Sequence, residues 1–311
     1  YKNAIDDYSI AIRIDSNYVD AYYNRGLANK EAGNYKNAIK DYSIAIKKNP
    51  NDAGTYNNRG NVYYDMEDYQ SAINDYSNAI RADSSYINAY NNRGLAYYSL
   101  REYKPAIKEY SNAILIDSNY TDAHYNRGLA YYHIGDYKNA MHDYTSTIRK
   151  DSNYAYAYNN RGLIYDNLKK YQLAIDDYSY AIEIEPNDAD AYNNRGLAYY
   201  NSENYKSAIH DYTSTIQIDS NYTEAYYNRG LAYYYSGNYQ LAIYDYSKAI
   251  EKDPNYTNAY HNRGLVYYYT EDYQLAIDDY SNAIKREPYD VSTYYNRGLA
   301  YYYSENYTSA I

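Results

Sequence analysis

The sequence predicts an all-α solenoid in which antiparallel helix hairpins stack one after another. The tripeptide Asn-Arg-Gly occurs nine times, and its glycines are each separated by 34 residues: Gly26, Gly60, Gly94, Gly128, Gly162, Gly196, Gly230, Gly264 and Gly298. A fixed period of this length is typical of stacked supersecondary units that contact only their neighbours. Within each period, apolar and aromatic residues recur at helical spacing over two stretches with a break between them. Each period is therefore expected to form two short amphipathic helices.

The two helices of one period are clearest in residues 189–222. The first helix is indicated by Tyr192, Asn193, Gly196, Tyr199 and Tyr200, and the second by Tyr205, Ala208, Ile209, Tyr212 and Ile216. The break between them holds Gly, Asn or Asp in most copies, as in Gly33-Asn34 and Gly135-Asp136. These residues predict a tight turn in which Asn or Asp caps the second helix. The link to the next period, such as Pro50-Asn51-Asp52, has turn chemistry as well.

The periods follow one another without a low-complexity linker. Complete units are predicted at residues 19–52, 53–86, 87–120, 121–154, 155–188, 189–222, 223–256 and 257–290. A half unit precedes them, because Tyr1–Ile5 matches Tyr35–Ile39, and a partial unit follows. Residues 1–311 are therefore expected to form a single continuous solenoid, and the sequence resembles a window from a longer array.

Composition limits the partners. The chain has 59 Tyr but no Phe, Trp or Cys, and its net charge of -10 argues against a nucleic-acid groove. No apolar run approaches the roughly 20 residues of a membrane helix, so membrane insertion is not expected. Without cysteine there are no disulfides or thiolate metal sites.

The repeated unit resembles the tetratricopeptide repeat, or TPR. Residues 155–188 match its pattern in their spacing with Tyr158, Arg161-Gly162, Tyr165, Ala174, Tyr178 and Pro186. Three departures recur: Tyr replaces the family's Trp and Phe, Arg replaces its Leu, and Ser replaces its Pro in several copies. The resemblance covers the whole chain. It implies a right-handed superhelix whose first helices line a concave groove.

The unusual arginines have acidic partners in the sequence. In an antiparallel hairpin, a residue on the first helix lies level with one about 16 places later on the second. That interval pairs Arg25 with Asp41, Arg59 with Asp75, Arg93 with Glu109, Arg127 with Asp143, Arg161 with Asp177, Arg195 with Asp211, Arg229 with Asp245 and Arg263 with Asp279. We interpret these as ion pairs that brace each hairpin, rather than as ligand-binding arginines.

Two kinds of tyrosine are distinguished by position. Residues such as Tyr22 and Tyr42 coincide with the family's core and are expected to pack with their hydroxyls at the rim. A second set directly follows the core tyrosine of its helix and is expected to turn toward the groove: Tyr64, Tyr98, Tyr132, Tyr200, Tyr234, Tyr268 and Tyr302. A hydroxylated aromatic surface suits a proline-rich peptide, sugar rings or another copy of the protein, but packing alone would also explain it.

Asparagines form a second ladder along the first helices: Asn24, Asn58, Asn92, Asn126, Asn160, Asn194, Asn228, Asn262 and Asn296. A carboxamide both donates and accepts, so it can bind an extended peptide backbone without reading side chains. The ladder resembles the one in the TPR superhelix of O-GlcNAc transferase. Asparagine also occurs at this position in repeats without such a ligand, so both interpretations stay open. The residues that precede the ladder include no lysine, which disfavours a clamp for a peptide's carboxylate terminus.

Two functions follow as hypotheses. The first is a non-catalytic scaffold that binds extended peptide or protein in an Asn- and Tyr-lined groove; the alternative is a structural protein whose repeats associate end to end into a filament. Glycosylation sequons begin at Asn119, Asn221, Asn255 and Asn306, a number that chance also explains. No targeting signal is present in the segment; a cytoplasmic location would suit the scaffold and an extracellular one the filament. No enzyme, cofactor or metal site is expected, because the five histidines are scattered.

Overall fold

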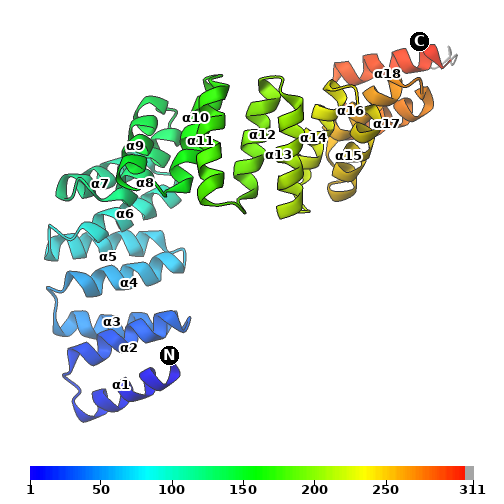
Figure 1. The fold of residues 1–311 in the computed structure, drawn as a ribbon. Coiled ribbons are helices and arrows are strands. Elements are labelled where there is room, and N and C mark those ends of the chain that lie inside the picture. The colour runs from blue at the N-terminus through cyan, green and yellow to red at the C-terminus, as the bar shows by residue number, and fades with distance from the viewer. Residues whose placement is uncertain (305–311) are drawn as a thin grey trace. The chain divides into compact units, whose positions relative to one another are not determined.

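The computed structural model describes residues 1–304, which form α-helices joined by short turns (Figure 1). The helices are α1 (Lys2–Ile14), α2 (Val19–Glu31), α3 (Tyr35–Lys48), α4 (Ala53–Asp65), α5 (Tyr69–Ala82), α6 (Ile87–Ser99), α7 (Tyr103–Ile116), α8 (Thr121–His133), α9 (Tyr137–Lys150), α10 (Ala155–Asn167), α11 (Tyr171–Ile184), α12 (Ala189–Asn201), α13 (Tyr205–Ile218), α14 (Thr223–Tyr235), α15 (Tyr239–Lys252), α16 (Thr257–Tyr269), α17 (Tyr273–Arg286) and α18 (Val291–Tyr303). The all-α prediction is confirmed.

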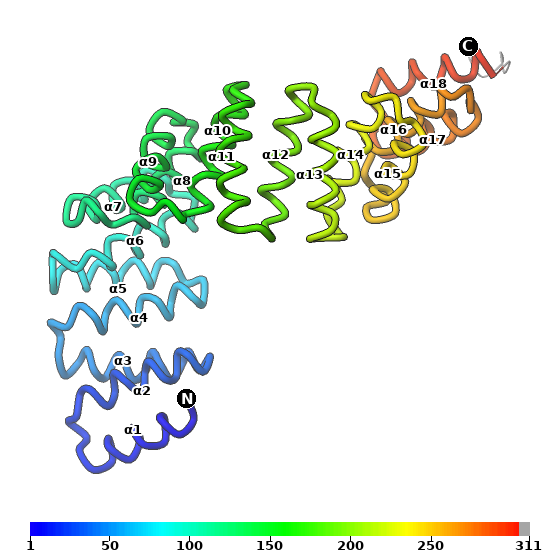
Figure 2. Tube along the Cα trace, viewed as in Figure 1, coloured from blue at the N-terminus to red at the C-terminus, as the bar shows by residue number. Residues whose placement is uncertain are grey.

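The contacts divide the chain into two compact units, Tyr1–Ser152 and Asn153–Ile311. In each unit a first helix packs on the second helix of its own hairpin, and that second helix packs on the first helix of the next. The trace turns back at alternate ends of successive helices (Figure 2). The predicted stack of helix hairpins is confirmed within each unit. One continuous solenoid over residues 1–311 stays a prediction.

The core repeats a glycine and a tyrosine that lie against each other. In residues 87–120, a Cβ on Gly94 of α6 would lie 2.6 Å from Cε1 and 3.0 Å from Cζ of Tyr110, which is fully buried on α7. Alanines surround the ring: Ala106 on the same helix and Ala130 on the next hairpin belong to the same cluster. The glycine lets the aromatic ring lie directly across the backbone of the first helix.

This close approach corrects one expectation about the tyrosines. The first-helix residue Tyr90 keeps its hydroxyl near the surface, where it donates to the Ser84 carbonyl at 3.3 Å. The hydroxyls of the second-helix tyrosines are instead buried, because the ring passes over the glycine into the hairpin. The Tyr76 hydroxyl donates to Asn61 Oδ1 at 2.9 Å, whereas the Tyr110 hydroxyl has no hydrogen-bond partner among the described residues. The placement of these hydroxyls at the rim was wrong, and burial raises the pKa of Tyr110.

All eight predicted arginine–acid pairs are present. Arg229 is representative: Nε and Nη2 donate to Oδ2 and Oδ1 of Asp245 at 2.7 and 2.8 Å. Its Nη1 donates to Thr213 Oγ1 of the preceding hairpin at 3.0 Å, a contact that the sequence reading missed. The other pairs are Arg25–Asp41, Arg59–Asp75, Arg93–Glu109, Arg127–Asp143, Arg161–Asp177, Arg195–Asp211 and Arg263–Asp279. Each pair braces its own hairpin, and most of the arginines also tie it to the previous one.

The turn between the two helices of a hairpin places one residue in the left-handed backbone region in every described copy. Gly33, Gly135 and Gly237 take φ values of 75° to 79° there. Glu67, Arg101, Lys169, Glu203 and Glu271 take 57° to 66° at the same position. The predicted caps follow this turn in some repeats: Asp68, Asp136 and Asn204 accept from the backbone of the second helix, whereas Asn34 and Asn238 make no side-chain cap bond.

Glu203→Gly is expected to stabilise the protein. In the left-handed region, a residue with a Cβ destabilises the folded state by about 1–2 kcal/mol relative to glycine. Glycine also gives the unfolded chain more conformational entropy, which offsets part of this difference. The free energy of unfolding is therefore expected to rise by up to about 1 kcal/mol. Urea denaturation followed by circular dichroism measures it. Gly237→Glu is the matched control and should lower the unfolding midpoint; a midpoint that falls for Glu203→Gly would contradict the expectation.

Candidate functional site

The asparagine ladder lies on the first helices, and its described side chains are half-buried. In five copies the side-chain nitrogen donates to the residue that precedes the ladder asparagine of the previous repeat. These bonds run from Asn58 to Tyr23 (2.7 Å), Asn92 to Asn57 (3.0 Å), Asn126 to Asn91 (3.1 Å), Asn194 to Asn159 (3.1 Å) and Asn262 to Tyr227 (2.8 Å). The ladder therefore connects neighbouring first helices, which the sequence reading did not foresee.

Ladder members differ in how much of the carboxamide these contacts use. Asn92 donates to Asn61 Oδ1 as well, at 3.2 Å. Asn194 uses one N–H for Asn159, and its carbonyl oxygen makes no hydrogen bond among the described residues. Asn228 makes no side-chain hydrogen bond within the part of the chain that the structure describes, and Asn160 has a partner of its own. A carboxamide with an unused donor and acceptor can bind the backbone of an extended peptide.

The second set of tyrosines packs against the start of the second helix in each hairpin. The ring centroids of Tyr64 and Tyr69 lie 5.3 Å apart. The same contact joins Tyr98 to Tyr103, Tyr132 to Tyr137, Tyr200 to Tyr205, Tyr234 to Tyr239 and Tyr268 to Tyr273, at 5.5 to 5.8 Å. The first tyrosine of each of these pairs is half-buried, whereas Tyr302 is 56% exposed. At this position the tyrosine ring therefore packs against the second helix and also remains partly exposed.

In residues 200–303 the ring contacts form an unbroken series, which we call the tyrosine strip. Tyr205 and Tyr235 stack at 5.7 Å, and Tyr235 contacts Tyr234 of the same helix at 5.1 Å. The series continues from Tyr234 to Tyr269, then to Tyr268, and then to the stacked pair of Tyr273 and Tyr303. Tyr235, Tyr269 and Tyr303 are each more than half exposed. The contributions of Tyr205 and Tyr273 could have been found from the sequence, because both lie five residues after a groove tyrosine.

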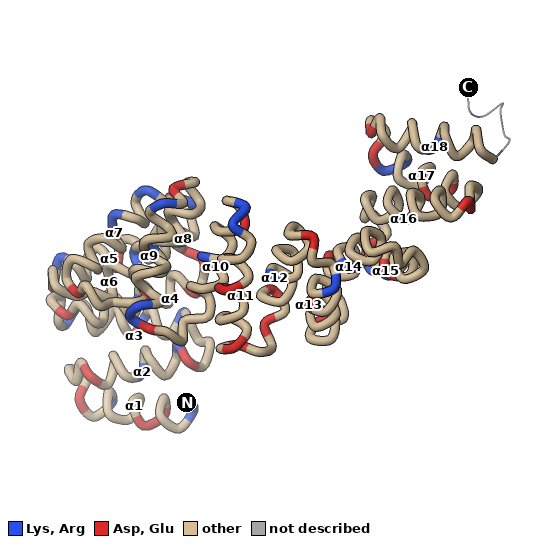
Figure 3. Tube along the Cα trace, turned by 45° about the horizontal axis from the view of Figure 1, so that its top comes forward, with Lys and Arg blue, Asp and Glu red and all other residues tan. Residues whose placement is uncertain are grey.

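Charge around these surfaces is mixed. In the view of Figure 3, Lys and Arg are interspersed with Asp and Glu in each unit, and the described residues show no continuous basic stripe. The arginine of each Asn-Arg-Gly is held largely inside the hairpin, as for Arg229, whose side chain is 13% exposed. Among the described residues, no group of His, Asp or Glu is arranged to hold a metal ion, and no helix is long and apolar enough to span a membrane.

Three of the sequon asparagines are exposed in turns between repeats: Asn119, Asn221 and Asn255. The side-chain oxygens of Asn119 and Asn221 accept from Lys150 and Lys252 at 3.1 and 3.2 Å. Asn306 lies outside the described residues. Glycosylation at these positions stays a prediction.

Family models match residues 1–290. A model described as TPR repeat matches residues 1–33, 30–67, 60–101 and 96–135. Models described as tetratricopeptide repeat match residues 122–154, 155–188, 189–222, 223–256 and 257–290. No curated protein sequence matches the chain.

Solved structures show the same fold. The C-terminal part of a TPR repeat-containing protein from Cytophaga hutchinsonii has a TM-score of 0.65 at 19% identity, over 76% of this chain and 97% of that one. YrrB, described as a TPR protein with an unusual peptide-binding site, has a TM-score of 0.54 at 24% identity, over 60% of this chain and 97% of its own. MamA has a TM-score of 0.50 at 28% identity, over 53% of this chain and 96% of its own.

Proposed function

Because the chain belongs to the tetratricopeptide repeat family, we propose that it is a non-catalytic scaffold that binds an extended peptide along its first helices. The observation that carries the proposal is that residues 189–303 have both the asparagine ladder and the tyrosine strip. Asn194 and Asn228 keep carboxamide groups available for a peptide backbone, and exposed rings such as Tyr235 offer apolar faces. The asparagines of the ladder and the tyrosines of the strip are themselves uncharged, so these side chains favour a neutral backbone over an ionic group.

The two surfaces favour a peptide in an extended conformation. Ladder positions recur once per repeat, so a ligand must run along several helices to reach more than one of them. An extended or polyproline-type segment presents its backbone groups at regular intervals and exposes ring or side-chain faces to aromatic partners. Hydrogen bonds to the peptide backbone would add affinity at each repeat and depend little on the sequence of the peptide.

The test uses a fluorescein-labelled 12-residue peptide of alternating Pro and Ser and the variant Asn228→Ala. Loss of one backbone hydrogen bond, at a net 0.5–1.5 kcal/mol, is expected to weaken binding by about 2- to 10-fold. Fluorescence anisotropy measures Kd. Asn255→Ala, at an exposed turn away from the first helices, is the matched control and should leave Kd unchanged. No binding at millimolar protein, or equal Kd for Asn228→Ala and wild type, would contradict the proposal.

The alternative proposal is self-association end to end into a filament. The exposed rings of the tyrosine strip support it as well, since clustered exposed aromatics mark protein interfaces. Electron microscopy together with light scattering over a concentration range separates the two proposals. Discrete particles at all concentrations favour the peptide scaffold, whereas continuous filaments favour the structural role.

A further inference from the structure

One inter-repeat turn differs from the others in the residues that cover it. In residues 223–256, the last residue of the repeat, Tyr256, lays its ring against Tyr227 of α14, with centroids 5.0 Å apart. In residues 155–188 the same two positions are Asp188 and Asn159. Among the eight complete repeats, this is the one that has no aromatic or histidine ring at either position. The space that the Tyr256 ring takes beside Tyr227 therefore has no ring in residues 155–188.

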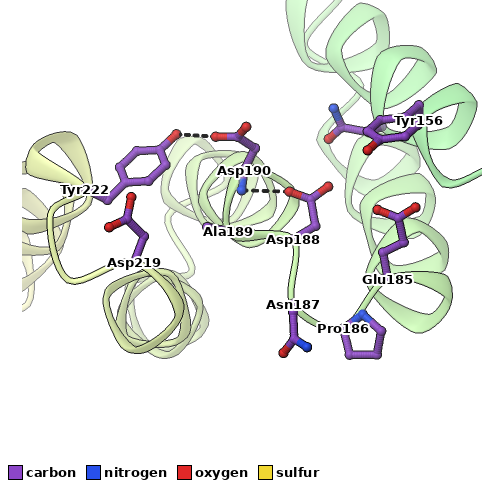
Figure 4. Close-up of a pocket in the computed structure, with 10 residues that line it drawn as sticks. Tyr156, Glu185, Pro186, Asn187, Asp188, Ala189, Asp190, Asp219 and Tyr222 are labelled. Atoms are coloured by element: carbon purple, nitrogen blue, oxygen red, sulfur yellow. Dashed lines mark hydrogen bonds between the residues drawn. The ribbon is translucent and has the colours of Figure 1, made fainter. Parts of the chain in front are cut away.

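The structure has a pocket of about 670 Å³ at this place (Figure 4). Its lining includes Tyr156, Glu185, Asp188, Asp190, Asp219 and Tyr222. Four of these residues carry carboxylates, and no Lys, Arg or His lines the pocket. Its electrostatic potential is therefore negative, and its walls include two tyrosines.

The carboxylates are not equally available to a ligand. The Tyr222 hydroxyl donates to Asp190 Oδ1 at 2.8 Å, and Asp219 accepts from the Asn221 backbone at 2.9 Å. Asp188 Oδ1 caps α12 by accepting from the backbone of Asp190 at 2.9 Å. The second oxygen of Asp188 and the whole Glu185 carboxylate have no hydrogen-bond partner among the described residues. Figure 4 shows both groups and Tyr156 among the residues that line the pocket.

We propose that the 156–222 pocket receives an arginine side chain of the bound peptide. Guanidinium is planar and of about the size of the missing ring, it can donate to two carboxylates at once, and its face packs on tyrosine. The inference rests on the proposed function, and the pocket adjoins the ladder because Asn159, which lines it, accepts from Asn194.

The same chain shows this chemistry in another inter-repeat turn. The Arg286 guanidinium lies 4.3 Å above the Tyr260 ring and donates from Nε to the Pro254 carbonyl at 2.8 Å. A lysine would fit the 156–222 pocket less well, because its ammonium is a compact charge. It cannot stack on a tyrosine ring as the planar guanidinium does, and it lacks the fixed, forked set of donors that suits carboxylates. A bare metal ion is not favoured, since no set of the described acids is arranged to coordinate one.

The experiment compares three versions of the labelled Pro-Ser peptide in which one central Ser is replaced by Arg, Lys or citrulline. Citrulline keeps the shape of arginine and removes its charge. We expect the arginine peptide to bind at least 10-fold more tightly than the citrulline peptide, with the lysine peptide between them. In the variant Glu185→Gln/Asp188→Asn, all three Kd values should become equal. Asn at position 188 retains a side-chain oxygen for the cap of α12, so the fold is preserved, which circular dichroism checks.

The matched control is Asp253→Asn/Glu271→Gln, which removes the same charge from two other turns of the same unit and should keep the preference for arginine. Equal Kd for the arginine and citrulline peptides on wild type would overturn the arginine pocket and leave the peptide scaffold intact. An arginine preference that the control variant also loses would show general charge attraction and overturn the pocket. Absence of binding by every peptide would overturn the scaffold proposal and this inference with it.

Discussion

Arg229→Leu is expected to lower the free energy of unfolding by about 3–5 kcal/mol, because it leaves a buried carboxylate without its positively charged partner. Asp245 is fully buried, and both of its oxygens accept hydrogen bonds from Arg229. Burial already raises the pKa of Asp245 above its ordinary value, although the hydrogen bonds and charge of Arg229 lower it. Without the arginine, the ionised carboxylate has no ion-pair partner among the described residues, and the Thr213 hydroxyl also loses a donor.

The loss should depend on pH in a definite direction. In the variant, the Asp245 pKa is higher in the folded than in the unfolded state, so the folded state binds more protons between these two values and stability falls as pH rises through that window. The deficit relative to wild type is therefore largest at pH 7 and shrinks as the pH is lowered toward the ordinary aspartate pKa. Urea titrations at pH 7 and pH 5 measure it.

Two further variants separate the pair from its surroundings. Arg229→Leu/Asp245→Tyr removes both charges and is expected to recover most of the loss, since a buried pair can be replaced by apolar groups when both partners go. Lys248→Ala breaks the exposed pair with Glu251 in the same repeat and should leave the midpoint unchanged. Equal midpoints for Arg229→Leu and wild type would refute a stabilising role for the pair.

The ion pairs show what a repeated sequence reveals. The 16-residue interval between Arg and acid recurs in every complete repeat, so hairpin geometry alone predicted all eight pairs. The third bond, from Arg229 to Thr213, lies between hairpins and depends on how one hairpin is placed on the next. A period fixes which residues are equivalent, but it does not fix the contact angle between neighbouring units.

The same distinction explains the candidate site. The asparagine ladder could be found from the sequence as a column of equivalent residues, but its cross-links to the preceding repeat, such as Asn194 to Asn159, could not. The pocket near Asp188 lies where one repeat differs from the others. The sequence shows which residues differ, but their importance becomes clear only from the contact between Tyr256 and Tyr227 in another repeat. Sequence gives the regular features of the solenoid, whereas irregular ones need the packing between units.

Gly94→Ala is expected to destabilise the protein by about 1–3 kcal/mol, even though alanine is the better helix former. The new Cβ would lie 2.6 Å from Tyr110 Cε1, a distance that ordinary carbon contacts do not allow. The ring cannot turn aside, because Tyr110 is fully buried among Ala106, Ala130 and its partly buried neighbours. Thermal unfolding and urea titration both report the loss.

The chain supplies its own control for the steric explanation. Gly298 occupies the same position of α18, but a Cβ there meets no described atom within 4 Å. Gly298→Ala should therefore be neutral or stabilise by up to about 1 kcal/mol through helix propensity. In a Tyr110→Leu background the cost of Gly94→Ala should shrink, because the smaller side chain leaves room for the methyl group and the two substitutions couple. Similar losses for Gly94→Ala and Gly298→Ala, or additive effects with Tyr110→Leu, would rule out the glycine–tyrosine contact as the reason that glycine occupies this position.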